Sequence, residues 1–576
     1  MHRQLIICCD GTDNNLTGRR NDTNVAQLCE LLAPDSQNQL LYYDPGVGNA
    51  GELPEANPWD RLQQKIQRAS SLAYGSGIYE NIAEAYRFLM RHWQPGDQIF
   101  LYGFSRGAFT ARSVGGLVTQ FGILRPEMDA MVPTLLYFYF LDREKFGKSY
   151  GDIKAQITQL FVSEAARTAP VWFVGVWDTV ASVGAPMVSR EITATPTIVN
   201  KRFTHVRQAL ALDEHRRSFQ PRLYSIEANY DYAAHGQSID QQWFSGAHSD
   251  VGGGYVNAQA GLSRQALLWM VRESSQCQLR LRPDLLSDQG QADSEKIINA
   301  LDERAKLHTM HHPLVHSASY DSPWWALAGL HVRNPRQADV RVKTKEKPPQ
   351  ESLTVGVNQL RFPASTQWRS PRSWRPVILA ALLAFVFWVI AGTFLLGPTQ
   401  LAGQNWWQQI VAGVQALPAV AAANAQLASW QTAWFMPWQE PSARLAAWHN
   451  PAMALVADFG LILAYGFLLG CAVSWAFARL ARLRGVNDAV PVWLNRLGLA
   501  APIAIASDIA ENLLTLALMA TTPSPNVPGW EYLLGFAMSL ASMGKWLGLV
   551  ACAILIGWGC LRKSKNTVLR SDSASA

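Results

Sequence analysis

The sequence predicts an α/β domain with a mostly parallel sheet and flanking helices, followed by an all-α bundle of four transmembrane spans. Three observations carry this prediction. Apolar strand-like runs alternate with helical patterns over residues 1–332, as in a parallel sheet covered by helices. Of the 186 residues from 376 to 561 only 12 are charged, against 16% of the whole chain. Four apolar segments in that region have about the 20 residues needed to cross a bilayer.

The α/β domain is expected to span residues 1–332. Residues 333–375 are basic and contain several prolines, which predicts a juxtamembrane linker attracted to anionic headgroups or, equally, strands that close the domain. The transmembrane domain is placed at 376–562, and a disordered tail at 563–576. Strands are predicted at 5–9, 40–43, 98–102, 171–177 and 242–245, and helices at 59–93 and 108–121.

A serine motif follows the third predicted strand. Residues 98–102 are apolar, residues 103–107 are GFSRG, and a helical pattern begins at 108. A strand, G-x-S-x-G and a helix together are typical of a nucleophile elbow, in which the two glycines make room in a tight turn. An ordinary strand-to-helix turn would have the same spacing. The motif makes Ser105 a candidate nucleophile, next to a helix N-terminus that favours developing negative charge.

A nucleophilic serine needs a base and an acid that orients the base. In α/β hydrolases the chain order is serine, acid and histidine, each after a strand. Asp178 ends the predicted strand 171–177, and His248 lies in a glycine-rich loop after 242–245. Asp250 is a rival orienting acid or a supporting residue behind His248. His215 is a rival base, but its charged, helix-like surroundings favour a solvated position.

The proposed chemistry also needs two backbone donors for the oxyanion. One is the N–H of Arg106, the residue after the nucleophile. The second is expected in the loop after the first strand, at Gly11 or Thr12, with Asp10 supporting the site. The loop at 44–48 is a second candidate.

The four predicted spans cover 377–397, 459–478, 497–520 and 532–561. Basic residues cluster before the first, after the second, before the third and after the fourth. The positive-inside rule therefore places both termini and the α/β domain in the cytoplasm. Asp508, Glu511 and Lys545 lie near the middle of the last two spans, where a lone charge is costly. We expect these charges to pair across the helices and fix their register, or alternatively to form a proton or ion path.

Composition argues against several classes of function. A formal net charge of +6 is small for a dedicated nucleic-acid binder. The seven cysteines include no C-x-x-C pair, so zinc and redox chemistry have little support, and no metal or cofactor is expected. The first apolar run has only five residues, which is too short for a secretory signal peptide.

Six short motifs together resemble the family of bacterial α/β-hydrolase domains once labelled DUF2235, which includes phospholipase effectors delivered by type VI secretion. The resemblance implies a serine esterase that acts on phospholipid acyl chains, with Ser105 as nucleophile, Asp178 as acid and His248 as base. It covers residues 1–330 and none of the predicted spans. The motifs are CDGT (9–12), TNV (23–25), GFSRGA (103–108), VWDTVASVG (176–184), ALDEHR (211–216) and GAHSDVGGGY (246–255).

These observations lead to three hypotheses of function. The first is a membrane-anchored serine phospholipase of the bacterial inner membrane. Its substrate would be membrane phospholipid, and as an effector it would be delivered to another cell and have an immunity or chaperone partner. The second is a membrane channel, toxin or transport element with a regulatory α/β domain. The third is a metal-dependent phosphohydrolase that uses Asp10, Asp13, Asp178, His248 and Asp250.

Overall fold

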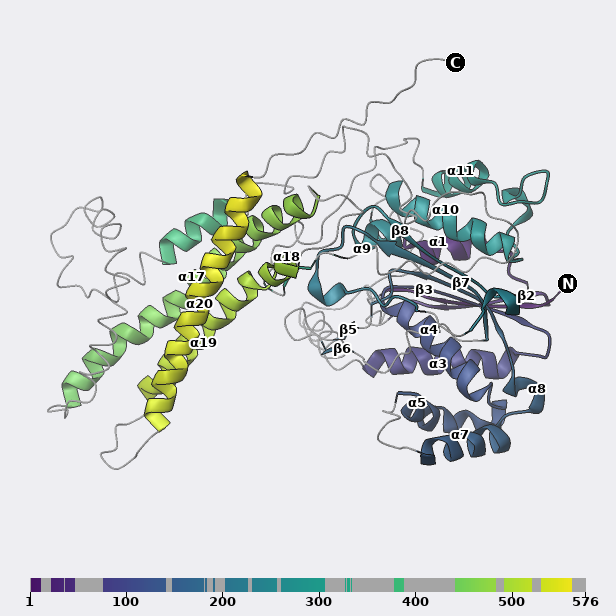
Figure 1. Cartoon of the computed structure of the whole chain (residues 1–576), viewed down its shortest axis with the longest axis horizontal. Coiled ribbons are helices and arrows are strands. Elements are labelled where there is room, and N and C mark those ends of the chain that lie inside the picture. The colour runs from purple at the N-terminus through teal and green to yellow at the C-terminus, as the bar shows by residue number, and fades with distance from the viewer. Residues whose placement is uncertain are drawn as a thin grey trace, which may run out of the picture. The chain divides into compact units, whose positions relative to one another are not determined.

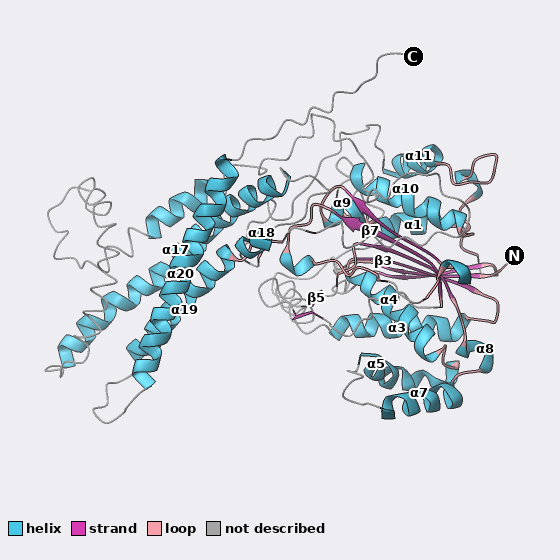
Figure 2. Cartoon of the chain, viewed as in Figure 1, coloured by secondary structure: helices cyan, strands magenta, loops and turns pink. Residues whose placement is uncertain are grey.

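The computed structural model divides into two compact units, an N-terminal α/β domain and a C-terminal helical unit (Figures 1 and 2). Along the chain, Leu330 belongs to the helical unit, whereas His331 and Arg333 belong to the α/β domain. The structure describes residues 2–11, 22–46 apart from 36, 76–140, 148–305 with gaps at 181, 184–189, 192–201, 226–229 and 256–260, 327, 329–331, 333, 378–387, 441–482, 492–520 and 530–561.

A six-stranded, all-parallel sheet forms the centre of the α/β domain. The sequence predicts a mostly parallel sheet and five of its six strands. Its spatial order is β2-β1-β3-β4-β7-β8. The strands are β1 (Gln4–Cys9), β2 (Gln39–Asp44), β3 (Gln98–Phe104), β4 (Val171–Trp177), β7 (Phe203–Ala211) and β8 (Ser238–Phe244).

The strand β7 is missing from the expectations drawn from the sequence. Its residues FTHVRQALA carry polar side chains in mid-strand, which hides the apolar run. The fold satisfies these side chains from elsewhere in the chain: Arg207 pairs with Glu273 at 2.6 Å, and the ring of His205 lies 2.7 Å from the Ser238 hydroxyl. Pairing of this kind depends on residues far away in sequence and leaves no local pattern.

Helices cover both faces of the sheet (Figure 1). Alternate residues of β1 point to opposite sides: Leu5 and Ile7 join the core beneath α3 (Ser76–His92) and α4 (Arg106–Phe121). Ile6 and Cys8 join a second core. Burial of each aliphatic side chain contributes about 1.5–3 kcal/mol. The second core is covered by α1 (Asn24–Leu31), α10 (Gly261–Gln276) and α11 (Ser294–Ala305).

The order of the strands determines where ligands would bind. The chain moves from β1 to β2 on one side, and β3 then pairs with β1 on the other side. Open α/β sheets bind their ligands at such a reversal, beyond the carboxyl ends of the strands. Gly11 follows β1 and Ser105 follows β3, so both candidate residues lie at this reversal.

Shorter elements complete the domain around the sheet. They are η1 (Pro126–Met131), α5 (Val132–Phe140), α7 (Lys148–Phe161), α8 (Glu164–Arg167), β5 (Ser182–Val183), β6 (Arg190–Glu191), η2 (Arg217–Phe219), η3 (Ala233–His235), α9 (His248–Gly252) and η5 (Pro283–Leu285).

The helical unit contains α17 (Pro441–Arg482), α18 (Val492–Leu497), α19 (Ala500–Ala520) and α20 (Trp530–Leu561). Within the described residues, three stretches are long and apolar enough to cross a membrane: Asp458–Phe477, Val492–Leu514 and Met543–Leu561. They correspond to the last three predicted spans. Of the first predicted span, Ile378–Phe387 is an apolar helix, and the rest lies outside the described residues.

The helix α20 shows two kinds of surface. A Cβ atom on Gly548 would come within 2.7 Å of the Ala504 nitrogen, so α19 and α20 approach backbone to backbone. Small residues at such a contact are typical of helices that associate in lipid. Elsewhere on α20, Leu547, Val550 and Ile554 are more than half exposed. Such apolar exposure suits a hydrocarbon environment better than water.

Candidate active site

Ser105 lies in a strained turn between β3 and α4. Its backbone has φ 59° and ψ −122°, and α4 begins at the next residue, Arg106. Residues other than glycine rarely adopt such a φ, and backbone strain of this kind costs about 1–3 kcal/mol. Both flanking glycines are required. A Cβ on Gly103 would lie 2.4 Å from the Gly107 carbonyl oxygen, and one on Gly107 would lie 2.2 Å from the Cys9 oxygen.

The structure brings Ser105, His248 and Asp178 together in one hydrogen-bonded row. The Ser105 hydroxyl oxygen lies 2.7 Å from His248 Nε2, and His248 Nδ1 lies 2.5 Å from Asp178 Oδ2. The three residues come after β3, β8 and β4. The sheet thus brings together Ser105 and His248, which are 143 residues apart in sequence, and His248 and Asp178, which are 70 apart. This is the geometry of a nucleophile, a base and an orienting acid.

The imidazole of His248 contacts two aromatic rings. The Phe104 ring centroid lies 4.6 Å away, and Phe219 meets the imidazole edge-on at 5.0 Å. Burial lowers the pKa of His248, while Asp178 raises it, and the net shift is downward. A neutral imidazole is therefore favoured near neutral pH, and only the neutral form can accept a proton from serine.

Asp178 is completely buried, with a positive φ of 41°. Burial alone would raise the pKa of its carboxyl group. The Arg333 guanidinium and the hydrogen bond from His248 outweigh burial and hold that pKa below its ordinary value. Its Oδ1 also accepts the N–H of Ala211 at 3.0 Å. The carboxylate is thus ionised and fixed in position.

Of the candidate oxyanion donors, Arg106 directly follows the serine. Arg106 is the first residue of α4, where backbone N–H groups point out of the helix end. Gly11 also lies in the turn after β1, but its N–H donates to its neighbour Asp10 at 2.6 Å. That bond would have to be exchanged for one to substrate. Thr12 lies outside the described residues. The second candidate loop packs close by, since a Cβ on Gly46 would lie 2.3 Å from the Gly11 oxygen.

The predicted supporting acids stabilise loops and do not touch the serine. Asp10 accepts hydrogen bonds from Thr23 at 2.6 Å and Tyr43 at 2.8 Å, and burial raises its pKa to about 6. Asp250 accepts the N–H of Ala247, which precedes His248, at 2.9 Å. It is Asp178 that contacts the imidazole.

One expectation about this region was wrong. His215 is buried, at 5% exposure, in a loop after β7, whereas its sequence suggested a solvated helix. The adjacent Glu214 explains the difference. Glu214 forms an ion pair with Arg216 at 2.8 Å and accepts the backbone N–H of His248 at 3.2 Å. This pairing draws the charged ALDEHR stretch into the interior, because buried charges require partners.

Sequence reasoning also missed Arg333. This side chain is 2% exposed and bonds both oxygens of Asp178. It is the first residue of the predicted linker, and no local pattern distinguishes it from the other arginines there. Residues 334–375 and 563–576 lie outside the described residues, so the predicted boundaries there stay predictions.

The metal-dependent phosphohydrolase hypothesis requires a cluster of metal ligands. In the described part of the chain, no three histidine, cysteine, aspartate or glutamate side chains are grouped so that they could hold a metal ion. Asp13 lies outside that part. In addition, both carboxylate oxygens of Asp178 already have partners, Arg333 and His248. A hard cation would have to displace both.

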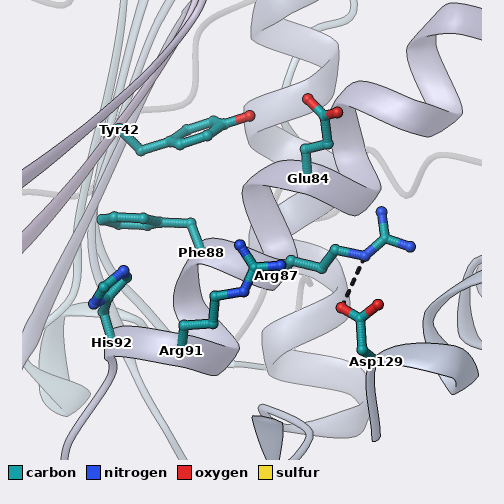
Figure 3. A pocket seen from close by; sticks show the side chains of 7 residues that line it. All are labelled: Tyr42, Glu84, Arg87, Phe88, Arg91, His92 and Asp129. Atoms are coloured by element: carbon teal, nitrogen blue, oxygen red, sulfur yellow. Dashed lines mark hydrogen bonds and ion pairs between the residues drawn. The ribbon is translucent and has the colours of Figure 1, made fainter. Parts of the chain in front are cut away.

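A hollow of about 420 Å³ lies elsewhere in the domain, between β2, α3 and η1 (Figure 3). It contains none of the residues of the row around Ser105. An ion pair between Arg87 and Asp129, 3.0 Å apart, crosses one side of it. Its lining residues are Tyr42, Glu84, Arg87, Phe88, Arg91, His92 and Asp129.

The three charges predicted to lie inside the membrane meet in the helical unit. Lys545 on α20 lies 2.6 Å from Asp508 and 3.4 Å from Glu511, both on α19. Tyr465 on α17 also donates to Asp508. Three helices thus share one polar cluster, which is the arrangement expected if pairing fixes helix register.

Replacing Lys545 with leucine is expected to destabilise the helical unit. Asp508 is 2% exposed and would lose its cation, and breaking a buried pair from one side costs about 3–5 kcal/mol. Thermal unfolding of the full chain in detergent should show a lower transition temperature. The double variant Lys545→Leu/Asp508→Leu should recover much of the loss, and Leu547→Ala, on an exposed side chain, serves as control. An unchanged transition in the single variant would exclude a structural role for the pair.

The fold and the row of side chains place the N-terminal domain in the α/β-hydrolase-like class: a parallel sheet with a serine elbow after one strand and its partners after two others. Residues 3–273 match the model of a family described as the catalytic domain of Tle1-like phospholipase effectors of the type VI secretion system. This match confirms the resemblance drawn from the six motifs. It covers a little under half of the chain.

A relative is found in Saccharomyces cerevisiae. YEL023C, described as an uncharacterised protein, is 31% identical over 242 residues, which is 39% of this chain and 34% of that protein. The chain therefore spans about a third of the length of this curated relative.

Proposed function

We propose that the chain is a membrane-anchored serine esterase that removes acyl chains from phospholipids, and that it acts as a type VI secretion effector. The observation that carries the proposal is the row Ser105–His248–Asp178 on a strained elbow, with bonds of 2.7 Å and 2.5 Å. The match of residues 3–273 to a phospholipase effector family supports the lipid substrate and delivery to another cell.

The reaction would begin when the Ser105 oxygen attacks the ester carbonyl carbon while His248 Nε2 takes the serine proton. The carbonyl oxygen becomes an oxyanion at the N-terminus of α4, where the Arg106 amide lies. Collapse of this intermediate expels the lysophospholipid alkoxide, which receives the proton from His248. Water then attacks the acyl-serine by the same route and releases a fatty acid.

The helical unit would keep the enzyme at its substrate. Its three apolar stretches are long enough to cross a bilayer, and basic residues flank the proposed inner ends. With the predicted span at 377–397 as a fourth crossing, insertion would place the α/β domain and both termini on the cytoplasmic side of the inner membrane in which the protein resides. An immunity or chaperone protein is a partner that an effector would require.

Product analysis tests the proposed reaction. The full chain, incubated with vesicles of phosphatidylethanolamine and phosphatidylglycerol, is expected to release fatty acid and lysophospholipid in equal amounts at first. A fluorophosphonate should label the tryptic peptide of residues 92–106, which contains Ser105. Phosphatidate or diacylglycerol as products, lost on addition of a chelator, would instead favour a metal-dependent phosphohydrolase.

A further inference from the structure

Arg333 makes four hydrogen bonds within the α/β domain, all through its two terminal nitrogens. Nη1 lies 2.5 Å from Asp178 Oδ1 and 2.7 Å from the Ala211 carbonyl oxygen. Nη2 lies 3.0 Å from Asp178 Oδ2 and also donates to the Phe219 carbonyl oxygen. The guanidinium therefore connects the acid to the end of β7 and to η2, whose Phe219 ring packs on His248.

The two-pronged contact sets the orientation of the carboxylate. A guanidinium presents its donors in one plane, so a bidentate pair fixes the rotation of the carboxylate as well as its position. Asp178 Oδ2 is shared by Arg333 and His248 Nδ1, which places that oxygen where the imidazole needs it. Arg333 lies outside residues 3–273, so the matched family domain does not contain it.

We propose that Arg333 is a positioning residue of the active site, which clamps Asp178 against His248 and whose charge sets the proton affinity of the Asp178–His248 pair. This inference rests on the esterase function proposed above. A guanidinium clamp differs from backbone amides in carrying a full charge, so its removal changes both the geometry and the titration of the pair.

The direction of the titration change follows from the charge. Without the cation, the pair holds its shared proton more tightly, whether that proton lies on the carboxylate or on the imidazole. The acid limb of the rate profile, which marks loss of the free base, therefore moves to higher pH. An opposite charge at this distance shifts a pKa by about 1–3 units.

Other charged groups face the same pair. Arg216 and Glu214 form their own ion pair next to His248. Burial, with Arg217 and Arg333, lowers the pKa of His331 to about 4, so His331 is neutral near neutral pH in the wild type; burial, the largest cause, remains in the Arg333 variants. Asp10, with a pKa of about 6, titrates in the same way in every variant. The test therefore compares the pH profile of each variant with that of the wild type.

The experiment compares full-length Arg333→Met, Arg333→Lys and wild type in profiles of kcat/KM against pH on a soluble ester. Arg333→Met is expected to lose about 100-fold at neutral pH through misplacement of the acid, with an acid limb at least about one unit higher. Arg333→Lys keeps the charge, so its limb should stay near that of wild type while kcat falls. Arg3→Met is the matched control, since Arg3 forms a two-pronged pair with Asp97 at the opposite end of the sheet.

Several outcomes overturn the proposal. If the acid limb of Arg333→Met lies at the same pH as that of the wild type, Arg333 has only a structural role. If Arg333→Lys keeps the full kcat, Arg333 does not orient the carboxylate. If Arg333→Met does not fold, Arg333→Gln, which is also uncharged and can still donate to one carbonyl, takes its place. Failure of the esterase function itself looks different, because wild type would then neither hydrolyse the ester nor react with a fluorophosphonate.

Discussion

Replacing Ser105 with alanine is expected to lower ester hydrolysis by roughly 10⁴- to 10⁶-fold, with the remaining rate coming from the oxyanion donors and binding alone. The reason is geometric: the Ser105 oxygen is the atom that lies 2.7 Å from His248 Nε2. The rate of fatty-acid release from vesicles measures the loss. Labelling by fluorophosphonate should vanish in the same variant.

Stability separates this effect from unfolding. Ser105→Ala keeps the Cβ atom and the strained φ of 59°, so its melting temperature should stay near that of wild type. Ser105→Gly should melt higher, because glycine adopts that φ without strain. The matched control is Ser113→Ala, a completely buried serine on α4 that should retain full activity. Full hydrolysis by Ser105→Ala would remove the serine mechanism altogether.

Replacing Asp178 with asparagine is expected to cost about 10⁴-fold in kcat/KM at neutral pH. Each group that contacts this carboxylate is a donor: Arg333, the Ala211 N–H and, through its Nδ1, His248. The amide NH₂ of asparagine must therefore face a donor whichever way it turns. Loss of the negative charge should also move the acid limb to lower pH, because Asp178 raises the pKa of His248. This shift is opposite to that expected for Arg333→Met.

The same substitution should destabilise the domain by about 3–5 kcal/mol, since it leaves the Arg333 cation buried without a counter-charge. Denaturant unfolding of the full chain measures the difference. Asp97→Asn is the control, because it weakens the Arg3–Asp97 pair at the far end of β3. It should cost stability and leave the pH profile unchanged. A wild-type rate in Asp178→Asn would show that another group orients His248.

Much of the candidate site could be read from local sequence, because Ser105 and Asp178 directly follow a buried strand and His248 comes four residues after one. The glycines around Ser105 and the strand before Asp178 are local signals, and parallel strands end at one edge of the sheet. The same logic failed for β7, where Arg207 and His205 interrupt the apolar pattern. Their partners, Glu273 and Ser238, are 66 and 33 residues away.

By itself, the sequence determined the parallel α/β class, the elbow at Ser105 and the helices apolar enough for a membrane. All three depend on the periodicity and content of apolar residues over short windows. Only the tertiary structure decided that Arg333 neutralises Asp178, that Glu214 and His215 are buried, and that Asp508 is the nearer of the two acids predicted to pair with Lys545. The physical reason is common to these cases. A charge can be buried only beside its partner, and the fold, not the neighbouring sequence, brings partners 155 or 37 residues apart into contact.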